Sequence, residues 1–122
     1  MQTPIVKQGK ILIATLQPDP SDGDLLDLRE RLAEKVGQHR SRGVIVDVTA
    51  LDVIDSYSVR MLRGLAHTTR LRGAETVIVG IQPEVALAMV HLGMTLESVA
   101  TGLDLEDGLD ELERIFALKA RP

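Results

Sequence analysis

The sequence predicts one α/β domain over residues 1–122, with a mostly parallel central sheet, an antiparallel strand at its amino-terminal edge and about four helices. Three observations indicate this class. Short β-branched runs alternate with longer amphipathic stretches. The first two runs are separated only by Gln8-Gly9-Lys10, which is typical of a hairpin turn. With 122 residues, of which 44% are hydrophobic, the chain can bury one core.

The first part of the chain is expected to form two strands, a helix and a third strand. Residues 5–16 are apolar apart from the turn and predict the hairpin. Two prolines and a glycine make residues 18–23 a loop, after which Ser21 or Asp22 caps a helix. Its apolar positions recur at helical spacing at Leu25, Leu28, Leu32 and Val36. Residues 44–48 are nearly all β-branched, as in a strand buried on both faces.

The second part continues the alternation of helices and strands. A helix follows the connection 52–56, with an inner face of Val59, Leu62, Leu65, Ala66 and Thr69. Residues 76–81 predict another buried strand, and Pro83 suits the first turn of a third helix that ends at Gly93. We expect its inner residues to be Val85, Ala86, Met89 and Leu92. A weak strand around 98–100 precedes a last helix with the stripe Leu105, Leu109, Leu112 and Phe116.

Composition excludes several classes of function. The chain has no cysteine, so disulfides and thiolate sites are absent. A net charge of −4, with only one Tyr and one Phe, argues against binding nucleic acid. Apolar runs are too short to span a membrane, and we expect a cytoplasmic protein. We expect no metal site, since His39, His67 and His91 fall on three different helices. We also expect no cofactor, because no phosphate-binding glycine motif is present.

Residues 47–58 hold the most informative group of polar side chains. They join the carboxyl end of a buried strand to a helix start, where open α/β sheets place their sites. Asp47, Asp52 and Asp55 occur there together with Ser56 and Ser58. In the simplest interpretation, Asp47 only ends the strand and Asp55 or Ser56 only caps the helix.

Two phosphorylation hypotheses compete with that interpretation. Asp47 as a phospho-accepting aspartate is rejected, because the first core strand ends in Ala14-Thr15-Leu16-Gln17 without an acidic pair and residues 99–102 carry no lysine. In the second hypothesis a partner kinase phosphorylates Ser56, with Ser58 as second choice. The phosphate would meet free N–H groups at the helix start. It would bring about −1.5 to −2 charge units beside Asp52 and Asp55 and so repel a docked partner.

The chain resembles the STAS family, the domain of anti-sigma-factor antagonists. The likeness is carried by the order of elements, the strand Val44-Ile45-Val46-Asp47-Val48 and the Asp55-Ser56 step, where those antagonists carry their phosphorylatable serine. Soluble antagonists usually read Asp-Ser-Ser-Gly there, whereas this chain continues with Tyr57-Ser58. Gly80-Ile81-Gln82-Pro83 and the segment 103–109 resemble the RsbS-type scaffold subunits of bacterial stressosomes within this family.

The resemblance implies a non-enzymatic scaffold in a large hetero-oligomer with RsbR-type co-scaffold proteins, and it also allows a homodimer. Such a scaffold sequesters an RsbT-type serine/threonine kinase and releases it when phosphorylated, here on Ser56, and an RsbX-type phosphatase resets it. The alternative within the family is a freestanding antagonist that binds an anti-sigma kinase, and the size of the complex discriminates the two. A third hypothesis, from the enzyme class, uses Asp47, Asp52 and Asp55 as Mg²⁺ ligands of a phosphatase.

Overall fold

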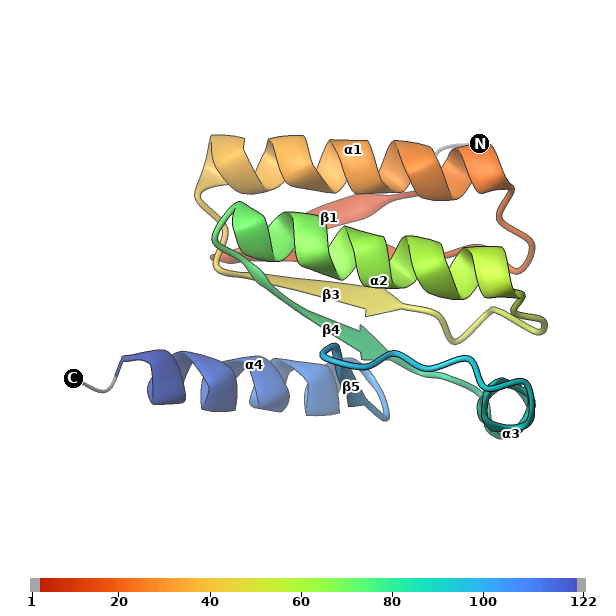
Figure 1. Ribbon diagram of the computed structural model, residues 1–122. Coiled ribbons are helices and arrows are strands. Elements are labelled where there is room, and N and C mark those ends of the chain that lie inside the picture. Colours follow the sequence, from red (N-terminus) through yellow and green to blue (C-terminus); the bar gives the residue numbers. More distant parts are fainter. Residues whose placement is uncertain (1–2, 121–122) are drawn as a thin grey trace.

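The computed structural model describes residues 3–120, which form a five-stranded mixed sheet with helices on both faces (Figure 1). The elements are β1 (Ile5–Gln8), β2 (Ile11–Thr15), α1 (Asp22–His39), β3 (Gly43–Asp47), α2 (Ser56–Leu71), β4 (Glu75–Val79), α3 (Pro83–His91), β5 (Ala100–Gly102) and α4 (Leu105–Lys119). The strands follow one another in the order β1-β2-β3-β4-β5. The β1–β2 pair is antiparallel, whereas β2–β3, β3–β4 and β4–β5 are parallel. This confirms the expected fold class and its antiparallel edge.

The register of the parallel strands brings their carboxyl ends to one edge of the sheet. Thr15 lies opposite Asp47, Asp47 opposite Val79, and Val79 opposite Gly102. Every connection from a parallel strand to the next helix therefore leaves from this edge. The polar residues that follow β3 consequently lie near the loops that follow β4 and β5.

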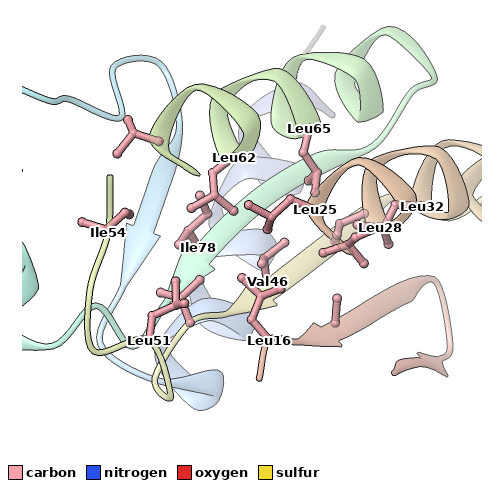
Figure 2. Packing of buried hydrophobic residues seen from close by; sticks show 14 of the residues in the cluster. Leu16, Leu25, Leu28, Leu32, Val46, Leu51, Ile54, Leu62, Leu65 and Ile78 are labelled. Atoms are coloured by element: carbon pink, nitrogen blue, oxygen red, sulfur yellow. The ribbon is translucent and has the colours of Figure 1, made fainter. Parts of the chain in front are cut away.

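Helices α1 and α2 cover one face of the sheet and bury the core of the molecule (Figure 1). The predicted inner residues of both helices are all buried. They pack on the side chains of β3 and β4 that point to this face, among them Val46 and Ile78 (Figure 2). The apolar periodicity of the sequence thus located both helices and their buried sides.

Helix α4 covers the opposite face over β3, β4 and β5. Leu112 is fully buried there against a second cluster that includes Ile45, Val77 and Val79. Gly108 permits the close approach, because a Cβ atom at this position would lie 2.6 Å from Cγ1 of Val79. The expected stripe is correct at Leu112 but not at its start, since Leu105 is exposed.

Two expectations about the third helix and the last strand are wrong. Ala86 and Leu92 are exposed, whereas Val85 and Met89 are buried as expected. The reason is that α3 lies past the carboxyl end of β4, away from the body of the sheet, so only part of its surface, including Val85 and Met89, reaches the core (Figure 1). The strand β5 begins two residues later than expected, because Ser98 has a φ of 67°, which an extended strand does not accommodate.

Within residues 3–120, no helix combines the length and apolarity that crossing a membrane requires.

Candidate functional site: the corner between β3 and α2

The connection from β3 to α2 is held to the core by two apolar anchors. Leu51 and Ile54 are 4% and 8% exposed and lie beside the core residues of the sheet (Figure 2). The backbone N–H of Val48 also donates to the carbonyl of Val79 at 2.9 Å. These contacts fix the position at which α2 begins. The surface at the corner between β3 and α2 is therefore held in a fixed position relative to the sheet.

Asp55 is the N-cap of α2. Its backbone is extended, and its Oδ1 accepts a hydrogen bond from the N–H of Ser58 at 2.7 Å. This bond to the backbone of Ser58 is the main reason why the pKa of Asp55 lies below its ordinary value. The capping interpretation of Asp55 is thus confirmed, and Ser56 becomes the first residue of the helix.

Ser56 presents its hydroxyl group to solvent. The residue is exposed, and within residues 3–120 its Oγ makes no hydrogen bond to another group. Ser58 is partly buried, and its N–H is occupied by the Asp55 carboxylate. Of the two serines selected from the sequence, Ser56 is the more accessible to an approaching enzyme.

Ser56 also lies on the wall of an open pocket of about 350 Å³. Its lining residues come from the connection before α2 and from the segment after α3: Ile54, Asp55, Ser56, Leu92 and Met94. Three of the five are apolar, and Leu92 is 67% exposed. Sequence analysis missed this neighbourhood because it placed Leu92 in the core. The unbroken apolar run from Val85 to Val90 could have indicated that part of α3 remains uncovered.

Asp47 is engaged in a separate turn. Its Oδ1 accepts hydrogen bonds from the backbone N–H of Thr49 at 2.9 Å and from the Thr49 hydroxyl at 2.6 Å. Nε2 of Gln82, at the start of α3, donates to the Thr49 carbonyl at 2.5 Å. These bonds tie the β3–α2 connection to the β4–α3 connection. The contact between Thr49 and Gln82 was not expected from the sequence, since it joins segments 33 residues apart.

The three carboxylates do not form a metal site. Asp55 caps α2, Asp47 is bound to Thr49, and Asp52 is exposed. Among residues 3–120, no three His, Asp or Glu side chains are grouped closely enough to hold a metal ion. The arrangement therefore gives the Mg²⁺ phosphatase hypothesis no ligand set in the part of the chain that the structure describes.

The three histidines lie apart on the surface, as their positions on different helices predicted. His39 is the last residue of α1, and His91 is the last residue of α3. His67 is exposed on α2 and lines a second open pocket, of about 370 Å³, together with Arg63, Arg70 and Glu97.

Comparisons with known proteins place the chain in a family context. A family model described as the STAS domain matches residues 4–108. The RsbT co-antagonist protein RsbRA of Bacillus subtilis (strain 168) is 34% identical over 82 residues, which are 67% of this chain but only 30% of RsbRA. A structure of RsbS from Moorella thermoacetica, a serine-to-glutamate variant, has a TM-score of 0.80 and 27% identity and covers 96% of this chain and 99% of that one. A chain in a solved stressosome has a TM-score of 0.75 and 29% identity, with 93% and 98% coverage.

Proposed function

Because this chain belongs to the STAS domain family, we propose that it is a scaffold and regulatory subunit of a bacterial stressosome, which holds a serine/threonine kinase and releases it when Ser56 is phosphorylated. The likeness to RsbS and to a stressosome chain extends over more than nine-tenths of the sequence and supports the scaffold role. Since the chain spans less than a third of RsbRA, the partners and regulation of that longer protein enter only as part of this proposal.

One observation carries the regulatory part of the proposal: an exposed serine hydroxyl at the first position of a capped helix. The kinase would transfer the γ-phosphoryl group of Mg-ATP to Oγ of Ser56. The new O–P bond replaces the bond to the β-phosphate oxygen, ADP leaves, and the hydroxyl proton passes to a base of the kinase. The product phosphate would meet unpaired N–H groups and the positive end of the α2 dipole, so the fold tolerates it.

The same phosphate changes the surface that a partner meets. It adds about −1.5 to −2 charge units beside the Asp55 carboxylate and at the edge of an apolar pocket. A partner that is docked across the corner must then accept the added charge or lose the contact. Buried Val59 and Leu62 anchor the helix below, so the effect stays at the surface. Phosphorylation therefore acts as a release signal.

The proposed partners follow from the same assignment. We propose a cytoplasmic hetero-oligomer with RsbR-type co-scaffold proteins, an RsbT-type kinase that is bound and released, and an RsbX-type phosphatase that removes the phosphate. The similarity to an RsbT co-antagonist supports the co-scaffold proteins and the kinase as partners. In this role the chain has no catalytic residue of its own, and Asp55 positions Ser56 by capping α2.

The first experiment is the intact mass of the protein after incubation with an RsbT-type kinase and Mg-ATP. The wild type is expected to gain one phosphate and Ser56→Ala none, whereas the matched control Ser58→Ala gains one like the wild type. A phosphate on Ser56→Ala would move the switch to another residue. Absence of any phosphate, with a kinase shown to be active on another scaffold, would remove the regulatory part of the proposal.

A pull-down with the kinase then tests release. Ser56→Ala is expected to retain the kinase in the presence of Mg-ATP, and Ser56→Asp to retain less of it than the wild type. Equal retention by the two variants would exclude Ser56 from the release mechanism. A freestanding antagonist is distinguished by size, because it forms a small complex with an anti-sigma kinase instead of a large assembly with a co-scaffold.

A further inference from the structure

A pocket of about 370 Å³ lies between the second half of α2 and the segment that precedes β5. The helix contributes Arg63, His67 and Arg70, which share one face because they recur at spacings of four and three residues. Residues 97–99 form the facing wall. The pocket shares no lining residue with the one that contains Ser56, and Arg63 follows Ser56 by about 10 Å of helix. It is therefore a separate feature of the molecule.

Arg70 holds the two walls of this pocket together. Its Nη2 donates a hydrogen bond to the carbonyl of Ser98 at 2.9 Å, and its Nε lies 3.5 Å from Oε2 of Glu75. Glu75 is nearly buried and also pairs with Lys119 of α4. The charge of Arg70 is thus balanced within the fold, and the opening between the walls does not depend on a ligand.

Arg63 and His67 are the cationic and imidazole groups that remain available in the pocket. Both residues are exposed, and in the part of the chain that the structure describes neither takes part in an ion pair. A guanidinium group presents its N–H donors in a planar fork that matches two oxygens of a phosphate group. The imidazole of His67 supplies a further N–H donor one helical turn away. The two side chains together suit an anionic group.

Gly64 leaves space beside these two side chains. Glycine is a poor helix former, yet this residue lies inside α2 and lines the pocket. Packing does not require a glycine here, because no atom lies within 4 Å of a Cβ atom added at this position. A larger side chain would project into the space between α2 and residues 97–99. The missing side chain therefore keeps open the volume that a ligand would occupy.

We propose that this pocket binds a small phosphate ester, with the phosphate group on Arg63 and His67. A volume of about 370 Å³ is in the size range of small-molecule sites. Ala66 and Val99 offer apolar contact to the carbon atoms of the ester. Glu97 on the facing wall repels a bare phosphate ion but accepts a hydrogen bond from a hydroxyl group of the ester. The site would give the chain a small-molecule input that is independent of Ser56.

A titration of the ¹⁵N-labelled protein followed by NMR tests this site. The probes are glycerol 3-phosphate, inorganic phosphate and glycerol. We expect glycerol 3-phosphate to cause saturable shifts of the backbone amides in residues 63–70 and 97–99. Inorganic phosphate is expected to bind several-fold more weakly, because it lacks the carbon stem and the hydroxyl groups. Glycerol should cause no saturable shift, because it lacks the phosphate.

Three variants show whether the pocket itself is responsible. Arg63→Gln should raise the Kd for glycerol 3-phosphate roughly tenfold or more. Arg60→Gln is the matched control, since it removes the same charge from an exposed position of α2 outside the pocket, and it should change the Kd by less than about twofold. Gly64→Leu fills the pocket and should abolish the shifts, while the thermal midpoint stays the same or rises.

Several results would overturn the site. Binding that survives in Gly64→Leu, or an equal loss of affinity in Arg60→Gln and Arg63→Gln, would mean that phosphate is attracted only by general surface charge. Absence of saturable shifts with glycerol 3-phosphate up to about 10 mM would exclude a ligand of this class. Binding of a phosphoserine peptide without binding of glycerol 3-phosphate would assign the pocket to a phosphorylated protein. Each of these failures would leave the scaffold proposal and the role of Ser56 in place.

Discussion

Replacing Gly108 by alanine is expected to destabilise the fold, because α4 crosses the sheet at this residue without space for a side chain. The added Cβ would lie 2.6 Å from Cγ1 of Val79 and 3.4 Å from Cδ1 of Ile45, whereas carbon atoms pack at about 3.5–4.0 Å. Both neighbours are fully buried, so the helix itself must shift. Overpacking at a site this tight costs about 3 kcal/mol, of which the higher helix propensity of alanine offsets about 1 kcal/mol.

The net loss of about 2 kcal/mol lowers the thermal midpoint by roughly 8 °C, since a chain of 122 residues has an unfolding entropy near 0.26 kcal/mol per kelvin. Gly64→Ala is the matched control. Gly64 lies inside α2, and no atom is within 4 Å of its added Cβ, so only helix propensity acts and the midpoint should rise by roughly 4 °C. Thermal denaturation followed by circular dichroism measures the midpoints of both variants. A rise for Gly108→Ala would refute the close packing of α4 on β4.

Three further predictions concern the corner between β3 and α2. Asp55→Ala removes the acceptor of the Ser58 N–H and should lower the unfolding free energy by about 0.5–1 kcal/mol. The pKa of Asp55 in the folded protein lies below its ordinary value of 3.8, so this stabilisation is present at neutral pH and is lost as the pH falls through the folded-state pKa. Urea titrations should therefore show the unfolding free energies of wild type and variant converging at acidic pH. Ser56→Asp places a carboxylate at the helix start and should leave the thermal midpoint within roughly 3 °C of wild type, or raise it, while less kinase is retained. A large drop in the thermal midpoint would contradict an effect confined to the surface. Gly80→Ala should cost about 2 kcal/mol or more in urea unfolding, because the residue has a φ of 83° and its Cβ would overlap the Thr49 hydroxyl; an unchanged midpoint would disprove the close contact.

Helices α1 and α2 could be predicted from the sequence because their apolar and polar positions are well separated. In α1, Leu25 and Leu32 share a face while charged residues fill the others, so only one side can pack on the sheet. The start of α2 was predictable for a local reason as well, since the Asp55 carboxylate reaches a backbone N–H only three residues away. Signals of this kind do not depend on the rest of the fold.

Helix α3 and the turn at Asp47 were not predictable in the same way. Residues 85–90 are apolar throughout, so their pattern does not distinguish the side that faces the core, and Leu92 was placed wrongly for that reason. The orientation of Asp47 depends on Thr49, whose carbonyl is bound by Gln82 from another connection. Only the completed register of β3 and β4 brings these residues together. The pocket beside Ser56 likewise combines segments that are distant in the chain.

For the proposed phosphorylation of Ser56, the structure favours an effect at the surface over a change of fold. Ser56 lies at the first helical position, and the residues below it are held in the core, including Ile54 at 8% exposed and Val59 at 2%. A phosphate there finds free N–H groups without displacing any packed side chain, so it creates no strain that could travel through the sheet. In the proposed switch, the difference in partner affinity between the phosphorylated and unphosphorylated forms would then arise within reach of the phosphate itself. Leu92 and Met94 line the pocket that contains Ser56, so a partner that contacts this pocket would meet the phosphate directly.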